Sequence, residues 1–296
     1  MKNIKITRGF TLSRGLTLIE LMITLVLSLM ITYAIAQVLI SSNRTSVTSD
    51  GMSQSQETGR FVMSFLANNI RSAGLDSITN DNVTTAAIIS CEDPAMAGLM
   101  DFEVAGNHQC SFESDLGGDP TVNTGDRLAI AWVPPVPAGG EALIRDCSGT
   151  GGYFADEIIL NVFWVEFDAQ NNMSNLVCRG HAFDGTNIIR SNGAQAIANG
   201  VESLHVLYGE GVQPLPVNSN RNVGRYVHGG AIADGGVNDW DRVYAIKVSI
   251  MTRSLTEVTN ALALRRYVLL DAQPYEINDA VSRQVFTTTF AINNYN

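Results

Sequence analysis

The spacing of hydrophobic residues divides the first quarter of the chain into two kinds of helix. Residues 21–43 carry no charge, and as an α-helix at about 1.5 Å per residue they span roughly 34 Å, enough to cross a bilayer core. Between Phe61 and Ile70 apolar residues instead recur at intervals of four, as on an amphipathic helix with one face to cover. The pattern predicts a membrane-length segment followed by a segment that packs on a folded domain.

The positions of glycines predict where this helix ends and where it is weakened. No Gly or Pro interrupts residues 16–50, and Gly74 follows the last apolar position, where a glycine commonly ends a helix as its C-cap. We therefore predict one helix over residues 16–73, loosened at Asp50–Gly51 or at Gly59.

Beyond residue 75 the pattern changes to short segments rich in β-branched and aromatic residues, bounded by Gly, Asn, Asp or Pro. The predicted strands lie within residues 126–133, 156–167, 174–183, 201–210, 240–254, 265–270 and 283–292. Asn171 and Asn172 predict a turn between two of them. A short helical turn is expected within residues 191–204.

Two long loops are predicted in this part, at residues 134–140 and 210–239. Thirty residues is long for a loop in a compact domain, so the second is either an exposed functional loop or contains a further strand.

A basic segment precedes the long helix. Residues 1–15 hold four cations and no acid, which favours a cytoplasmic location for this end. Glu20 is the only acid in residues 16–49, and a carboxylate in a membrane helix costs about 2.5–3.5 kcal/mol at the helix centre, so a cationic partner is expected. Cleavage after Gly15 would create one, the amine of Leu16. Glu20 would then be the fifth residue of the mature chain. Cleavage after Gly9 would instead make Arg14 the fifth residue.

Polar residues recur along the predicted membrane helix. Thr24, Ser28 and Thr32 follow Glu20 at intervals of four and so lie on one face. Small polar side chains let membrane helices approach closely and hydrogen-bond, which makes this row a candidate helix-packing face. The alternative is that the hydroxyl groups hydrogen-bond to their own backbone.

The combination of basic leader, Gly15, uninterrupted apolar helix and Glu20 resembles the type IV pilin family. The resemblance implies that prepilin peptidase cuts between Gly15 and Leu16, that the new Leu16 amine is N-methylated, and that Glu20 pairs with a charge during assembly. An uncleaved single-span anchor is the alternative that hydropathy alone allows.

Three further segments resemble the PilW group of minor type IV pilins. They are residues 55–75 (SQETGRFVMSFLANNIRSAGL), 197–210 together with 240–254, and 283–294 (RQVFTTTFAINN). The resemblance implies an α+β pilin fold, related to the J-type minor pseudopilins, in which a long N-terminal helix packs on a β-rich C-terminal globular domain. The expected parts are a leader (1–15), a transmembrane half-helix (16–43), an amphipathic half-helix (44–74) and a periplasmic or extracellular domain (75–296).

The family resemblance also implies a role and partners. Such proteins prime pilus assembly and sit at the fibre tip with other minor pilins, next to the major pilin and sometimes a tip adhesin. The chain would be held in the inner membrane with a cytoplasmic N-terminus before assembly, and in the extracellular fibre afterwards. A type II secretion pseudopilin is a close alternative. A membrane-tethered periplasmic binding or enzymatic domain is a more distant one.

Four cysteines follow the apolar segment and would face an oxidising compartment. Three disulfide connectivities are possible, and pairing between chain neighbours favours Cys91–Cys110 with Cys147–Cys178. Four free thiols are the alternative.

Charge and the scattered candidate residues argue against other activities. Without the leader, 15 cations face 29 acids, a net charge of −14, which disfavours direct nucleic-acid binding. The histidines, which form no motif of a known site, are His108, His181, His205 and His228. Asp234, Asn238, Asp239 and Asp241 lie close in the chain but lack calcium-loop spacing. We expect no enzyme activity, metal or cofactor.

Overall fold

A computed structural model provides the structure of this protein. It describes Gly15 and residues 17–75, 87–88, 125–137, 140–154, 157–184, 188–211, 222–232, 239–258 and 262–292. The chain divides into two compact units, Met1–Val47 and Thr48–Asn296. The N-terminal helix contributes residues to both units.

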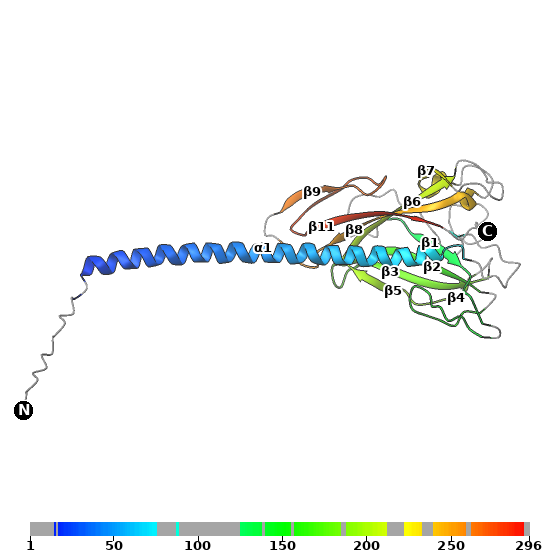
Figure 1. Ribbon diagram of the computed structural model, residues 1–296, viewed down its shortest axis with the longest axis horizontal. Helices are drawn as coiled ribbons and strands as arrows, with labels where there is room; N and C mark the ends of the chain where they lie inside the picture. The colour runs from blue at the N-terminus through cyan, green and yellow to red at the C-terminus, as the bar shows by residue number, and fades with distance from the viewer. Residues whose placement is uncertain are drawn as a thin grey trace, which may run out of the picture. The chain divides into compact units, whose positions relative to one another are not determined.

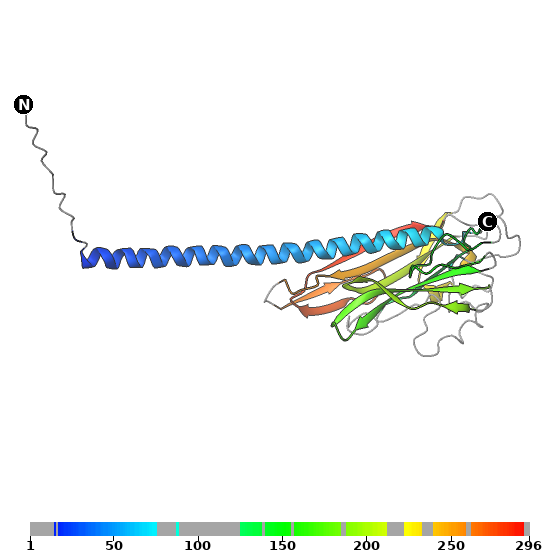
Figure 2. The same cartoon turned by 90° about the horizontal axis from the view of Figure 1, so that it is seen from below.

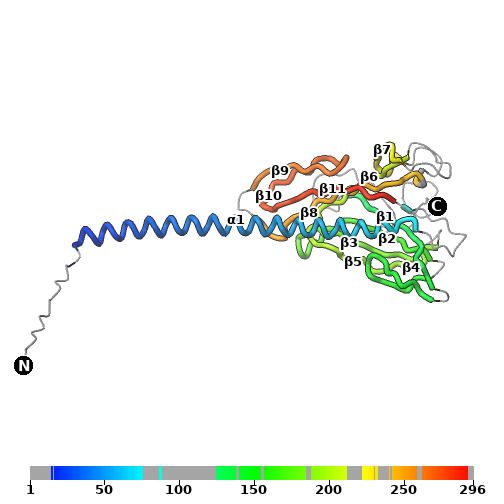
Figure 3. The backbone as a smooth tube through the Cα atoms, in the orientation of Figure 1, coloured from blue at the N-terminus to red at the C-terminus, as the bar shows by residue number. Residues whose placement is uncertain are grey.

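The predicted long helix is present as α1, Leu18–Ser72 (Figure 1; traced as a tube in Figure 3). It continues through Gly51 and Gly59, so the expected loosening at these glycines does not occur. Gly74 adopts the left-handed conformation with φ 70°, and its N–H donates to the Ala131 carbonyl at 2.9 Å. The predicted glycine cap is confirmed, because few other residues adopt this φ without strain.

The helical part of the first unit is exposed along its length. All its side chains from Leu18 to Val47 are exposed, although most are apolar. Among the described residues, α1 is the one helix long and apolar enough to cross a membrane.

In the second unit the first sheet has five antiparallel strands. The order is β1-β2-β3, and β4 and β5 pair with different parts of β3. The strands are β1 (Leu128–Trp132), β2 (Ile158–Asp168), β3 (Met173–Phe183), β4 (Ile188–Ser191) and β5 (Gln195–Asn199). The predicted turn joins β2 to β3, and Asn172 has φ 50° there.

The second sheet has the strand order β11-β8-β6-β7 and is also antiparallel. Its strands are β6 (Val201–Gly211), β7 (Val223–Val227), β8 (Val243–Arg253) and β11 (Arg283–Ala291). A separate hairpin pairs β9 (Ala263–Tyr267) with β10 (Tyr275–Asp279). Two short 3₁₀ helices, η2 (Gly229–Ala231) and η4 (Asp239–Arg242), complete the described elements.

β7 and β5 test two predictions, one about a long loop and one about a helical turn. β7 lies within residues 210–239, so that segment contains the further strand considered above. The helical turn expected before β6 is wrong, because residues 195–199 form β5. The ladder with β3 supplies hydrogen bonds that a local turn would lack, and it overrides the weak helical preference of this alanine-containing segment.

The amphipathic half of α1 packs on both sheets. Val62, Leu66 and Ile70 are fully buried in one core with Phe163 of β2 and Leu204 of β6. Figures 1 and 2 show the sheets lying along this part of the helix from two directions. The predicted apolar face is confirmed at these positions.

Small residues let the helix approach the second sheet. Gly51, Ser55 and Gly59 are buried at intervals of four, and a Cβ at Gly51 or Gly59 would overlap Val258 or Phe286. The hydroxyl groups of Ser55 and Thr252 meet at 2.8 Å, and the Thr252 hydroxyl donates to the Ser55 carbonyl at 3.0 Å. These contacts explain why glycines occur in the interior of this helix.

Candidate functional site

The start of α1 contains the predicted processing and assembly residues. Gly15 and Glu20 are exposed; Leu16, where cleavage and N-methylation are predicted, lies outside the described residues. The Thr17 hydroxyl accepts a hydrogen bond from the Glu20 N–H at 3.3 Å. Thr17 and Glu20 thus have the spacing of a capping box, in which a hydroxyl residue is followed three positions later by Glu.

This cap gives Glu20 a structural role besides the predicted charge pairing. A carboxylate in the first turn of a helix interacts favourably with the helix dipole. The signal was present in the sequence as Thr-x-x-Glu at residues 17–20. A test of charge pairing at Glu20 must therefore separate its charge from its place in the cap.

The polar row of the helix forms local hydrogen bonds in the isolated chain. The hydroxyls of Thr24 and Ser28 donate to the carbonyls of Leu21 and Leu25, at 3.0 and 2.9 Å. The Thr32 hydroxyl donates to the Ser28 carbonyl at 2.8 Å. The hydroxyl oxygens can still accept a bond from a neighbouring helix, so the packing face remains a prediction.

A disulfide joins Cys147 to Cys178 of β3, with the Cα atoms 6.2 Å apart. This pair is confirmed. Cys91 and Cys110, for which the second disulfide was predicted, lie outside the described residues, as do His108, Asp234 and Asn238. The side chains of Asp239 and Asp241 are likewise not described.

The disulfide belongs to a hydrogen-bonded group at the end of α1. The buried Asn161 amide donates to Asn69 of α1 at 3.0 Å and accepts from the Cys147 N–H at 3.1 Å. Asp146 accepts hydrogen bonds from the Tyr153 hydroxyl at 2.7 Å and from the Asn192 amide at 2.6 Å. Burial, and then the hydrogen bond to Asp146, raises the pKa of Tyr153 above its usual value. This group fixes residues 146–153 against β3.

A second group of buried polar side chains surrounds one histidine of β6. His205 contacts the Tyr275 hydroxyl at 2.8 Å and lies 3.5 Å from a carboxylate oxygen of Asp126. The Ser203 and Tyr275 hydroxyls are 2.7 Å apart. These four side chains are at most 2% exposed, so the group connects β6 to β10 but offers no access to a substrate.

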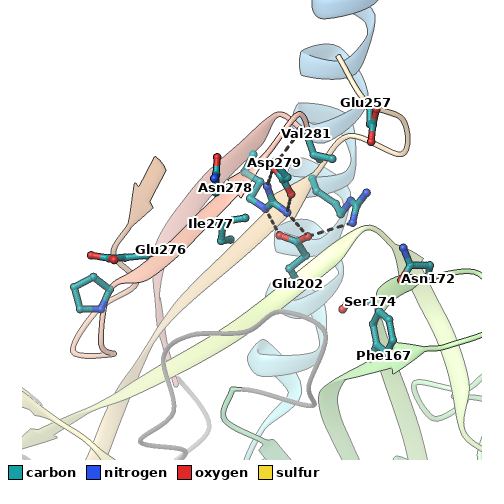
Figure 4. A pocket seen from close by; sticks show the side chains of 13 residues that line it. Phe167, Asn172, Ser174, Glu202, Glu257, Glu276, Ile277, Asn278, Asp279 and Val281 are labelled. Atoms are coloured by element: carbon teal, nitrogen blue, oxygen red, sulfur yellow. Dashed lines mark hydrogen bonds and ion pairs between the residues drawn. The ribbon is translucent and has the colours of Figure 1, made fainter. Parts of the chain in front are cut away.

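A cavity of about 800 Å³ lies between the β2–β3 turn and the β10–β11 region (Figure 4). At its floor Arg283 pairs with Glu202 and Asp279, and Arg253 lies 3.5 Å from Glu202. Glu202 occupies a bulge in the β6–β8 pairing, and a bulge can redirect a side chain.

The charges at the cavity floor balance one another. Partial burial would raise the pKa of Asp279, but hydrogen bonds from Arg283 and from the Val281 N–H, together with the charges of Arg283 and Arg253, lower that pKa below its usual value. Burial opposes the charge of Arg283, yet its bonds to Asp279 and Glu202 raise its pKa. The two acids and two arginines link β6, β8, β10 and β11, so the network has a structural role.

The cavity and the buried groups thus show no assembled chemical site. Among the described residues, no three His, Cys, Asp or Glu side chains are placed to hold a metal ion. The features with a functional pattern are the exposed apolar segment of α1, the single acid of that segment, Glu20, and the β-rich domain that follows.

The fold defines a class of protein in which a membrane-length N-terminal helix leads into an antiparallel β-rich domain, as the pilin resemblance implies. Residues 162–294 match the family model PilW, described as type IV pilus-assembly protein W. The PilW resemblance is therefore confirmed over the segment from β2 to beyond β11. The resemblance at residues 55–75 lies outside this match.

A type IV-like pilin from Thermus thermophilus aligns with 62% of this chain and 85% of that chain, at 14% identity and a TM-score of 0.34. No curated protein matches the sequence.

Proposed function

We propose that this chain is a minor type IV pilin, a structural subunit that primes pilus assembly and sits at the fibre tip. The observation that carries the proposal is the presence, in one chain, of a PilW-family β-domain and a membrane-length helix with a single acid in its first turn. A tethered enzyme or binding domain needs an apolar anchor, but it has no need of an acid there.

The proposed pathway begins in the inner membrane with a cytoplasmic N-terminus. Prepilin peptidase removes residues 1–15, and Leu16 becomes the N-methylated first residue. The exposed apolar face of α1 then leaves the lipid and packs among the helices of other minor pilins and the major pilin, with a tip adhesin as a further partner. Thr24, Ser28 and Thr32 lie on the proposed packing face.

Glu20 is proposed to pair with the amine at the first residue of a neighbouring subunit. In a low-dielectric helix bundle an unpaired carboxylate or amine is unfavourable, and removing one partner of a buried pair costs roughly 3–5 kcal/mol. Charge pairing thus couples a subunit's entry into the fibre to its correct register.

The test is the number of surface pili in strains that carry each variant as the only copy. Glu20→Ala should leave a processed, membrane-held protein and at least a tenfold loss of pili. Glu20→Gln should give a similar loss, because it keeps the shape and removes the charge, whereas Glu20→Asp should be intermediate.

Thr17→Ala is the matched control. It removes the hydroxyl that accepts from the Glu20 N–H and leaves the carboxylate, so it should retain most pili. If Thr17→Ala and Glu20→Ala fail equally while Glu20→Gln assembles, Glu20 acts only as a helix cap. Normal piliation with Glu20→Ala would favour the tethered-domain alternative.

A further inference from the structure

β11, drawn in red in Figure 1, forms one edge of the second sheet. The Ser254 N–H donates to the Ser282 carbonyl and the Ile292 N–H donates to the Tyr244 carbonyl, both at 2.8 Å. These two bonds flank an uninterrupted nine-residue pairing of β11 with β8. Because the backbone groups of successive residues point to opposite sides of a strand, the even-numbered residues of β11 bond to β8 and the odd-numbered residues face away from it.

The backbone groups that face away form a row along the edge. They belong to Val285, Thr287, Thr289 and Ala291, which are all exposed. Within the part of the chain that the structure describes, no strand pairs with this side of β11. Each of these residues presents one N–H donor and one C=O acceptor, and such a row is a template for a further strand. The edge can therefore receive an extended segment of another chain.

The two edges of this sheet differ in how they are protected. Edge strands usually carry charged residues, proline or a bulge that prevents further pairing. β7 follows this rule, because the side chain of Arg225 is 65% exposed and the pairing with β6 contains a register shift. In β11, residues 284–291 contain no charge and no proline, and the pairing with β8 contains no register shift. The contrast indicates that β11 is the edge kept open for a partner.

We propose that the outward edge of β11 pairs with an extended strand of a neighbouring, different pilin subunit. The inference rests on the proposed function, because that function supplies the neighbouring subunits. Main-chain hydrogen bonds would hold the added strand, as in other cases of β-augmentation. Val285, Thr287 and Thr289 share one face of β11 and are all β-branched, so they fit uncharged, β-branched residues on the partner strand.

A different pilin explains the open edge better than a second copy of this chain does. Pairing of β11 with β11 would be isologous and would close a dimer, whereas a fibre grows through heterologous contacts. Pairing of β11 with β7 would be heterologous, and the two edges run in opposite directions, because the four strands alternate. However, β7 has only five residues and is the protected edge. A neighbour with an unprotected strand in that place has the required direction.

Thr287→Pro tests the edge directly, because the Thr287 N–H points away from β8. Proline removes this outward donor and no hydrogen bond to β8, and proline is tolerated at such edge positions. Thr287→Val is the matched control. It keeps the N–H and, like the proline variant, loses the 2.9 Å contact between the Thr287 and Ser249 hydroxyls.

The measurement is the number of surface pili in strains that carry each variant as the only copy. Thr287→Pro should reduce the number of pili at least fivefold, whereas Thr287→Val should reduce it less than twofold. Both full-length variants should be present at the wild-type level and unfold at the same temperature in detergent.

A second variant decides the matter if the proline variant does not fold. Thr287→Lys keeps the strand and its N–H but places a charge on the edge, which disfavours strand addition. It should also lower the number of pili at least fivefold. Gln170→Lys, in the exposed turn between β2 and β3, is its control and should leave the number of pili unchanged.

The partner is identified by photo-crosslinking in piliated cells. Benzoylphenylalanine at Thr289 should form an adduct with another protein that has a prepilin-type N-terminal helix. Mass spectrometry should map the crosslink to an uncharged segment of that protein, and Thr287→Pro should reduce the adduct at least fivefold. The same amino acid at Gln170 should not form this adduct.

The contrary outcomes are distinguishable. Normal piliation with both Thr287→Pro and Thr287→Lys, when Glu20→Ala prevents assembly, would overturn the edge contact and leave the proposed function intact. Normal piliation with Glu20→Ala would remove the proposed function and this inference with it. An adduct at Thr289 with a second copy of this chain or with a protein that lacks a pilin helix, or no adduct, would overturn the assignment of the partner.

Discussion

At the residue scale, His181 of β3 gives the clearest dependence on pH. It is fully buried, and burial, followed by the charge of Arg179, lowers its pKa from 6.5 to about 4. Between these values the unfolded chain binds the extra proton, so the folded state loses stability as pH falls through 6.5 towards 4. The expected contribution is a loss of about 2 kcal/mol between pH 7.5 and pH 5.

The measurement is denaturant unfolding of the wild type and His181→Gln at both pH values. The variant should show a smaller decrease in the free energy of unfolding on acidification, by about the same 2 kcal/mol. His228→Gln is the control, because it removes an exposed histidine. This variant should show the same pH dependence as the wild type. Equal pH dependence in all three proteins would contradict the assignment.

At the scale of elements, the buried glycines of α1 decide how closely the helix packs. Gly→Ala in a helix interior usually stabilises it by about 1 kcal/mol. Here a Cβ at Gly59 would overlap the Phe286 ring, so we expect Gly59→Ala to destabilise the domain by about 1–3 kcal/mol. Thermal unfolding checks the sign, with the exposed Ser53→Ala as control. Phe286→Leu should restore part of the loss; a stabilised Gly59→Ala variant would show that the helix can shift freely.

The disulfide between Cys147 and Cys178 is the second prediction for an element. It closes 31 residues of chain, and restricting the unfolded chain to that extent corresponds to about 3–4 kcal/mol. Replacing both cysteines by serine should lower the free energy of unfolding by this order, measured in denaturant. Peptide mapping without reductant should recover the Cys147–Cys178 pair. Two alkylatable thiols at these positions in the native protein would refute it.

At the scale of the whole molecule, the proposed function requires that prepilin peptidase remove residues 1–15. We expect the mature protein to begin at Leu16, and Gly15→Ala to leave the leader attached. Intact mass of the membrane form, with and without prepilin peptidase, distinguishes these forms. Gly9→Ala is the matched control and should be processed normally. A mature chain that begins at Phe10 would show that the other glycine is the cut.

Part of this molecule follows from local patterns in its sequence. The long helix, its end at Gly74 and the positions of β2, β3, β6, β8 and β11 were predicted, because apolar periodicity and turn residues act over a few neighbours. The spacing of Gly15 and Glu20 is likewise visible within a few residues of chain. Cys147–Cys178 was favoured among several pairings and is present in the structure.

Only the tertiary structure decided which distant residues meet. Ser55 and Thr252 are 197 residues apart in the chain, and Glu202 and Arg283 are 81 apart, so no local pattern indicates either contact. β5 formed a strand because β3 offered hydrogen bonds to it. The sequence predicts weak points of the helix at Gly51 and Gly59. In the structure they are points of close packing, because a glycine's effect depends on what lies against it.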